Sequence, residues 1–190
     1  MAGKKTIGVL ALQGDFEAHQ NALERVGANA VPVRTAGELN SVDALIIPGG
    51  ESTTMLKLLD LENLWEPLSA FGQQKPIFGT CAGAILLASH VQNPLQRSLG
   101  LMDMTVERNA YGRQLDSHIA KIHPEGWRDD LEAVFIRAPI IREVGPQAHV
   151  LARHRNDPVL VEQGRHMAAT FHPELTLDPR IHQLFLDRVK

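Results

Sequence analysis

The composition of the chain limits both its class and its partners. It has 190 residues, 44% hydrophobic and 22% charged, which is the size and balance of a single compact domain over residues 1–190. The net charge of -3 provides no basic field for nucleic acid or anionic lipid. No apolar stretch approaches the roughly 20 residues that a membrane span needs. We therefore expect a soluble cytoplasmic protein with no nucleic-acid or membrane partner.

The first half of the chain alternates short apolar runs with segments of helical spacing. Continuously apolar runs predict strands that are buried on both faces. Such runs occupy residues 7–12, 30–33, 44–47 and 76–78. Helices are predicted from the capping residue Asp15 to about Val26, as two short helices over 53–71 broken near Asp60, and over 84–89. This alternation indicates a parallel sheet with helices on both faces.

The second half of the chain changes character. Strand-like segments separated by turn residues follow one another without helices between them, so some of them should pair antiparallel. They cover residues 105–108, 119–122, 133–137, 150–154, 159–163 and 166–170. A closing helix is predicted over 179–189, with a proline in its first turn and one apolar face.

The one cysteine of the chain lies in a pattern typical of a nucleophile. A lone cysteine excludes an internal disulfide and a multi-cysteine zinc site. Cys81 is the centre of Gly79-Thr80-Cys81-Ala82-Gly83, between a predicted buried strand and a helix, which is the form of a nucleophile elbow. The helix N-terminus there favours the thiolate. Most lone cysteines are small buried hydrophobes, but the two glycines and the strand-to-helix context favour the nucleophile.

The best candidate for the base lies in His172-Pro173-Glu174. Pro173 restricts His172 to extended backbone, and residues two apart then project to the same side. Glu174 can thus orient the ring and leave its other nitrogen free to exchange protons with sulfur. Alone, this tripeptide is more often a loop without a role. Of the nine histidines, however, none of the others has so short a rigid link to a carboxylate. No metal site is predicted, because no histidine pair has the His-Glu-x-x-His spacing.

A second glycine turn follows the third predicted strand. Pro48-Gly49-Gly50-Glu51 should lie at the same carboxyl edge of the sheet as the cysteine elbow, so that the two turns face each other. The N–H groups of Gly50 and Ala82 could then form an oxyanion hole. Glu51 could receive a substrate ammonium. The alternative is a common glycine turn in which Ser52 or Thr53 caps the next helix.

Taken together, these motifs resemble class I glutamine amidotransferases, which share the GxCxG elbow, the upstream Pro-Gly-Gly turn and a late His-Pro-Glu. Within that class the chain resembles the glutaminase subunits of pyridoxal 5'-phosphate synthases. The segments that carry the resemblance occur in the family's order and span nearly the whole chain: LQGDF (12–16), PGGEST (48–53), TCAG (80–83), ERNAYGRQ (107–114) and FHPELT (171–176). Ala84, where a larger aliphatic residue is usual, is a small departure. The resemblance implies a three-layer, flavodoxin-like α/β fold.

The resemblance also implies a reaction and a substrate site. Cys81, His172 and Glu174 would hydrolyse L-glutamine to L-glutamate and ammonia through a thioester. An arginine can grip the carboxylate of glutamine through two hydrogen bonds, although without the resemblance the two arginines concerned would more often be solvated charges. The implied glutamine-binding residues are Gly49, Gly50, Glu51, Arg108, Ile136 and Arg137.

The expected partner is a synthase subunit that uses the ammonia to form pyridoxal 5'-phosphate, in a large hetero-oligomer that activates the glutaminase. No cofactor is expected in this chain. One alternative is a glutaminase that feeds another acceptor, such as imidazole glycerol phosphate synthase, but the ERNAYGRQ and LQGDF segments oppose it. A non-catalytic regulatory or redox module is opposed by the retention of His172 and Glu174, and an elbow cysteine peptidase is more remote. The roles of Tyr111, Arg113 and Gln114 stay open.

Overall fold

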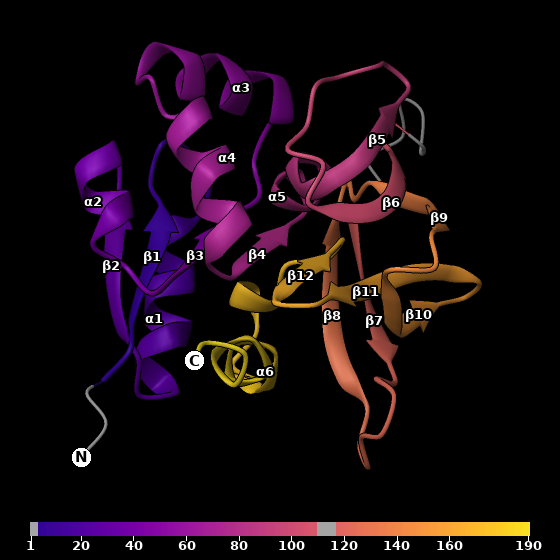
Figure 1. Cartoon of the computed structure of the whole chain (residues 1–190). Coiled ribbons are helices and arrows are strands. Elements are labelled where there is room, and N and C mark those ends of the chain that lie inside the picture. The colour runs from indigo at the N-terminus through magenta and orange to yellow at the C-terminus, as the bar shows by residue number, and fades with distance from the viewer. Residues whose placement is uncertain (1–3, 110–116) are drawn as a thin grey trace.

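The computed structural model describes residues 4–109 and 117–190 (Figure 1). At its centre is a seven-stranded sheet. The neighbouring strands from β12 to β2 are all parallel, whereas β10 and β11 extend the sheet antiparallel. From one edge to the other the strands are β10 (His149–His154), β11 (Asp157–Gln163), β12 (His166–Ala169), β4 (Ile77–Thr80), β3 (Ala44–Ile47), β1 (Thr6–Leu10) and β2 (Asn29–Val33).

Helices cover both faces of this sheet, so its central strands are buried and read as uninterrupted apolar runs. One apolar core, which includes Leu59 and Phe71, lies under α2 (Ala36–Asn40), α3 (Ser52–Leu61), α4 (Trp65–Gln74) and α5 (Ala82–Leu87). The other core, which includes Leu23 and Phe185, lies under α1 (Phe16–Arg25) and α6 (Arg180–Leu186). Over residues 4–109 and 117–190, no helix has the length and apolar character to cross a membrane.

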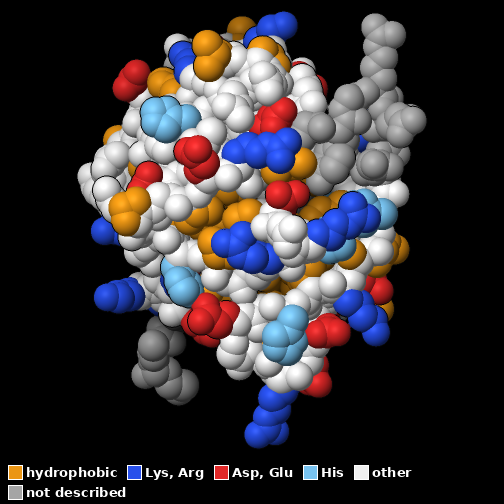
Figure 2. Space-filling model, turned by 90° about the vertical axis from the view of Figure 1, so that its right-hand side faces the viewer, with side chains coloured by type: hydrophobic (Ala, Val, Ile, Leu, Met, Phe, Trp, Pro, Cys, Tyr) orange, Lys and Arg blue, Asp and Glu red, His pale blue; other side chains and the backbone are white. Residues whose placement is uncertain are grey.

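Two small sheets complete the structure beside the central one (Figure 1). The first has the order β5 (Ala88–Gln92), β6 (Met102–Glu107) and β9 (Ile140–Val144), and the second is the antiparallel pair β7 (Ser117–Ile122) and β8 (Leu131–Ile136). Figure 2 shows this side of the molecule, where acidic and basic side chains are interspersed around a band of hydrophobic ones. The predicted α/β architecture, mostly parallel with antiparallel strands in the second half, is confirmed.

The structure differs from the sequence prediction in several elements. The predicted helix over 84–89 is wrong at its end, because Ala88 already begins β5, which pairs with β6. The helices predicted over 53–71 separate at 62–64 rather than near Asp60. Helix α2 was not predicted, although Thr35 and Glu38 form a capping box that the sequence displays. Strand β9 was also missed, since the exposed polar residues Arg142 and Glu143 interrupt its apolar run.

Two glycines allow α5 to approach the sheet closely. A β-carbon on Gly83 would lie 2.1 Å from the carbonyl oxygen of Ile47 in β3, and one on Gly79 would lie 2.4 Å from the carbonyl carbon of Gly83. Both obstacles are backbone atoms, which cannot rotate away. Glycine at these positions therefore brings the start of α5 against β3 and β4 and shapes the turn between strand and helix.

We predict that Gly83→Ala lowers the free energy of unfolding by about 3 kcal/mol, the upper part of the range for overpacking, because the added methyl must displace the β3 backbone. Chemical unfolding followed by circular dichroism measures it. Gly37→Ala is the matched control, since its β-carbon would have only Thr35 Oγ1 nearby, at 4.0 Å. It should be neutral or stabilise α2 by up to about 1 kcal/mol. Equal stability of the Gly83 variant and the wild type would contradict the packing argument.

Candidate active site

A cleft of about 380 Å³ opens at the carboxyl edge of the central sheet. This is where the loops after parallel strands converge, and it is the usual place for a site in an open α/β sheet. The cleft brings together segments from six parts of the chain. Its lining is Gly14, Asp15, Gly49, Gly50, Glu51, Ser52, Cys81, Ile85, Arg108, Asn109, Ile136, Arg137, Pro139 and His172.

Cys81 lies at the turn between β4 and α5 with backbone angles φ 49° and ψ -104°. A positive φ is uncommon for a residue with a side chain, and such strain persists only where the surroundings enforce it. Here the Cys81 N–H donates to the carbonyl oxygen of Ala169 in β12 at 2.8 Å, and the Cys81 carbonyl accepts from Ile85 in α5 at 3.2 Å. The turn thus presents the sulfur to the cleft, as the elbow pattern predicted.

His172 and Glu174 meet Cys81 from the other side of the cleft. The backbone N–H of His172 donates to the carbonyl of Val134 in β8 at 2.8 Å, which anchors this segment. Ring atom Nδ1 lies 2.8 Å from Oε1 of Glu174, a buried residue of the turn η1 (Pro173–Leu175). A carboxylate accepts, so Nδ1 carries the proton and Nε2 is left for Cys81. The segment turns at Pro173 instead of staying extended, yet it brings the two side chains together as expected.

The electrostatics of this group favour an ionised pair. Burial alone would lower the pKa of His172, but hydrogen bonds to Cys81 and Glu174 outweigh it and raise the pKa to about 10. Burial would likewise raise the pKa of Glu174, yet the neighbouring His19 and His172 hold it below its usual value. At neutral pH an imidazolium therefore lies beside a carboxylate, poised to give a proton to a leaving group.

The Gly49-Gly50 turn packs directly against these side chains. A β-carbon on Gly49 would lie 2.5 Å from Cε1 of the His172 ring and 3.3 Å from Cβ of Cys81. Gly50 has φ 139°, and below it the side-chain amide of Gln13 donates to the carbonyl of Glu51 at 2.7 Å. Within the described part of the chain, the N–H groups of Gly50 and Ala82 donate to no other residue.

Arg108 and Glu51 form the polar wall of the cleft. The Glu51 carboxylate caps α3, accepting from the backbone N–H of Thr53 at 2.9 Å and of Thr54 at 2.7 Å. Burial raises its pKa, but the hydrogen bonds from Thr53 and Thr54 together prevail and lower the pKa to about 2. Arg108 donates to Thr53 Oγ1 at 2.7 Å and lies 3.6 Å from Oε1 of Glu51. Its buried Nε has no partner among residues 4–109 and 117–190.

Ile136 and Arg137 reach the cleft from the end of β8, where Arg137 has φ 43°.

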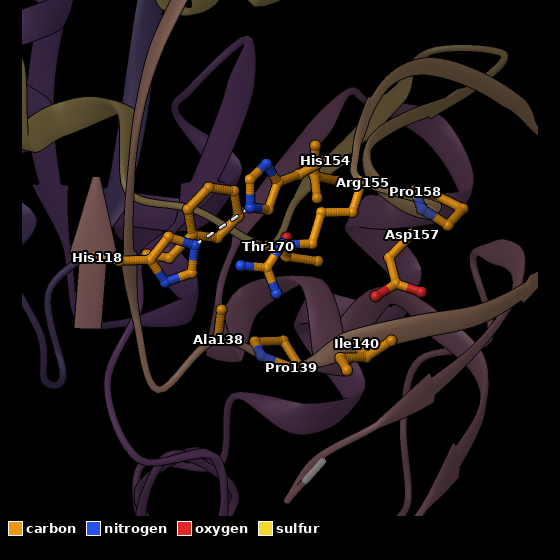
Figure 3. A pocket seen from close by; sticks show the side chains of 11 residues that line it. His118, Ala138, Pro139, Ile140, His154, Arg155, Asp157, Pro158 and Thr170 are labelled. Carbon is orange, nitrogen blue, oxygen red and sulfur yellow. Dashed lines mark hydrogen bonds between the residues drawn. The ribbon is translucent and has the colours of Figure 1, made fainter. Parts of the chain in front are cut away.

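Beyond Pro139 lies a second hollow of about 230 Å³, in which His118 and His154 face each other (Figure 3). Both rings stack on Phe135, at centroid distances of 4.9 and 5.2 Å. Phe135 in turn packs edge-on against Phe171, the residue before His172, with 5.9 Å between the ring centroids. This aromatic group therefore supports the segment that carries His172.

Several residues that line the cleft or lie behind it were not predicted as site residues from the sequence. Gly14, Asp15, Ser52 and Asn109 fall inside segments quoted for the resemblance, so the signal was available, whereas Ile85 and Pro139 carried none. His19 is fully buried beside Glu174, with Nε2 at 3.3 Å from Oε2. Tyr111, Arg113 and Gln114 lie outside the described residues. The described ranges contain no cluster of three potential metal-binding side chains.

The fold at whose carboxyl edge these side chains meet is that of a class I glutamine amidotransferase. Known proteins agree with this. The model of the SNO glutamine amidotransferase family matches residues 9–190. Similar proteins are the pyridoxal 5'-phosphate synthase subunit PdxT of Solibacter usitatus, 58% identical over 97% of this chain and 100% of the relative, and that of Koribacter versatilis, 54% identical over 97% and 95%. The chain belongs to the SNO glutamine amidotransferase family.

A solved structure supports the same class, and a more distant one shares the fold. A crystal structure described as a glutamine amidotransferase superposes with a TM-score of 0.90 at 46% identity, covering 96% of this chain and 98% of the other. A chain of PurLQS from Thermotoga maritima superposes with a TM-score of 0.69 at 16% identity, covering 99% and 100%. The second likeness concerns the fold alone.

We predict that Cys81→Ala lowers the pKa of His172 from about 10, because it removes the hydrogen bond and the charge that favour the imidazolium, while Glu174 remains. The measurement is an NMR pH titration of the His172 ring in both proteins. His166, a buried histidine on β12, serves as an internal control and should titrate alike in both. An unchanged His172 titration would mean that Cys81 and His172 do not interact.

Proposed function

We propose that this protein hydrolyses L-glutamine to L-glutamate and ammonia, with Cys81 as nucleophile, His172 as general acid and base and Glu174 as the group that orients His172. The observation that carries the proposal is that Cys81 and His172 line one cleft, while Glu174 is paired with His172 behind it. The elbow backbone of Cys81 and the 2.8 Å contact between Nδ1 of His172 and Oε1 of Glu174 are both features of an activated nucleophile.

In the first half of the proposed reaction, the Cys81 thiolate attacks the side-chain amide carbon of glutamine. The carbonyl π electrons move onto oxygen, and this oxyanion is held by the N–H groups of Gly50 and Ala82. Such a donor typically contributes about 3 kcal/mol to lowering the barrier. The C–N bond then breaks as the nitrogen takes the proton from Nε2 of His172, which releases ammonia and leaves a thioester on Cys81.

In the second half, neutral His172 removes a proton from a water molecule, which attacks the thioester carbon. The C–S bond breaks, glutamate leaves, and the thiolate again pairs with the imidazolium. The sum is glutamine plus water giving glutamate plus ammonia. Glu174 stays ionised throughout, because its role is to hold the imidazole orientation and stabilise its charged form.

We propose that the α-carboxylate of glutamine binds at Arg108, where a buried Nε lacks a partner within the described part of the chain. The side chain of Arg108 is only 11% exposed, so a hydrogen bond formed there is shielded from water. Gly49, Gly50, Ile136 and Arg137 would complete the pocket. Glu51 would line the pocket with its backbone, and its carboxylate fixes the turn by capping α3. The same carboxylate would also accept a hydrogen bond from the ammonium group of glutamine.

The proposed fate of the ammonia is transfer to a synthase subunit that forms pyridoxal 5'-phosphate. The support is similarity, since relatives of 49–58% identity carry the name pyridoxal 5'-phosphate synthase subunit PdxT. A subunit name implies a partner. We therefore propose a hetero-oligomer of this chain with the synthase subunit, in the cytoplasm. We prefer this synthase subunit as the acceptor of ammonia to imidazole glycerol phosphate synthase.

The proposal predicts that glutamate release from glutamine rises several-fold when the synthase subunit is added and is lost in Cys81→Ala, which lacks the sulfur that forms the thioester. Glutamate production by the purified protein, alone and in the mixture, measures this. Circular dichroism of the variant serves as the folding control. Hydrolysis by Cys81→Ala at the wild-type rate would refute the nucleophile, and no hydrolysis by the wild type in the mixture would refute the acceptor.

Arg108→Met should raise the KM for glutamine about 10- to 100-fold, the factor that a hydrogen bond to a charged group is worth, with a smaller effect on kcat. Steady-state kinetics with the synthase subunit present measure both constants. Arg165→Met is the matched control, because Arg165 contacts the Gln73 carbonyl and is not among the residues lining the cleft. An unchanged KM in Arg108→Met would remove Arg108 from the substrate site.

A further inference from the structure

Two histidines lie behind the triad, in the core between α1 and α6. Neither His19 nor His182 has any exposed surface. Nδ1 of His19 lies 3.0 Å from Nε2 of His182, and Nε2 of His19 lies 3.2 Å from Oγ1 of Thr80 and 3.3 Å from Oε2 of Glu174. A polar chain therefore runs from Glu174 away from the cleft and into the apolar core.

The chemistry of this chain determines where its protons lie. Burial lowers the pKa of His19 and of His182, so both rings are neutral at neutral pH, with one N–H and one acceptor nitrogen each. The carboxylate of Glu174 can only accept. We therefore assign the proton of His19 to Nε2, which faces both Glu174 and Thr80 Oγ1, so that Nδ1 accepts from the Nε2–H of His182.

The chain ends in the protein interior. With its proton on Nε2, His182 has a bare Nδ1, and this buried atom has no hydrogen-bond partner in the ranges 4–109 and 117–190. A proton passed along the chain would have no group to receive it. The two histidines are consequently unsuited to relaying protons to solvent, and a role in holding Glu174 is the one their geometry allows.

Glu174 needs such a partner. Its Oε1 contacts His172, whereas its Oε2 is buried and forms no hydrogen bond of ordinary geometry with a described residue. A buried carboxylate with one uncompensated oxygen is costly and can relieve the cost by rotating or by taking up a proton. Either change would weaken its contact with His172. Nε2 of His19 faces the uncompensated oxygen at 3.3 Å.

We propose that His19 is a positioning residue of the triad, which holds Glu174 at Oε2 so that Oε1 stays on His172. His182 supports it by fixing the tautomer of His19. The kinetic part of this inference rests on the proposed glutamine hydrolysis, but the effect on His172 rests on the geometry alone. The two parts can therefore be tested separately.

The first test needs no variant. Nitrogen NMR of the imidazole rings in the wild-type protein reports which nitrogen of each neutral histidine carries the proton. We expect the Nε2–H tautomer for His19. The Nδ1–H tautomer would leave no donor toward Glu174 and would overturn the proposal.

The second test compares His19→Gln with His19→Asn. The longer glutamine side chain can place its amide N–H where Nε2 was, whereas the shorter asparagine reaches only the position of Nδ1. Both variants are polar and lose the ring. In His19→Asn we expect kcat for glutamine hydrolysis to fall about 10- to 100-fold with KM nearly unchanged, and His19→Gln to keep most of kcat.

Two readouts on the free protein accompany the kinetics. The NMR titration of His172 should move to lower pH in His19→Asn and much less in His19→Gln, since a displaced Glu174 supports the imidazolium less. Alkylation by iodoacetamide is specific, because Cys81 is the one cysteine of the chain. Its rate at pH 7 should fall in His19→Asn, since less thiolate is paired with an imidazolium.

His166→Gln is the matched control. His166 is also buried, and its Nδ1 accepts from the N–H of Ile77 at 3.2 Å, away from the triad. This variant should lose stability while leaving the His172 titration, the alkylation rate and kcat at wild-type values. It separates a specific effect on Glu174 from a general loss of packing.

Wild-type values of the His172 titration and of kcat in His19→Asn would overturn the proposal, as would equal losses in the asparagine and glutamine variants. If the wild type with the synthase subunit releases no glutamate, the proposed function fails, and the tautomer, titration and alkylation still decide the role of His19. If the wild type is active and His19→Asn retains full activity and titration, the function stands and the inference fails.

Discussion

The structure of the site depends on the strained backbone at Cys81. A residue with a side chain adopts φ 49° only when its neighbours leave no alternative, and here the neighbours include the backbone of Ala169 in β12 and of Ile85 in α5. Gly79 and Gly83 permit that close packing. Because the turn is clamped between β4, β12 and β3, the sulfur is held at one point of the carboxyl edge, and every other group of the cleft is positioned relative to it.

The second constraint is the burial of ionised side chains away from water. His172 and Glu174 are both buried, so each is costly as an ion unless the other compensates it. The compensation extends further than the triad, to Thr80, His19 and His182, and it lies in the core between the central sheet and the helices α1 and α6. The geometry of the candidate triad is thus continuous with the packing of that core. On the open side of the cleft, Glu51 and Arg108 are instead arranged around the N-terminus of α3, where Glu51 caps the helix and Arg108 contacts Thr53.

Much of the candidate site could be predicted from the sequence because the signals for it are local. The strand, turn and helix around Cys81 follow from an apolar run, two glycines and a second apolar run. The pairing of His172 with Glu174 follows from a short, proline-restricted link. The capping box at Thr35 was equally local and could have been used, whereas β5 was hidden because Ala88 and Ser89 continue an apolar helical pattern and become a strand only through pairing with β6.

The sequence by itself determined the α/β class, the nucleophile elbow, the candidate base and the family, since these depend on residues adjacent in the chain or on motifs in a given order. Only the tertiary structure decided which distant segments meet. It brought α1 to α6 so that His19 faces Glu174, turned the Glu51 carboxylate onto α3, and left Nε of Arg108 without a partner among the described residues. The reason is physical: such contacts are set by how the helices pack on the two faces of the sheet, and no local periodicity encodes the distance between side chains that lie 155 residues apart.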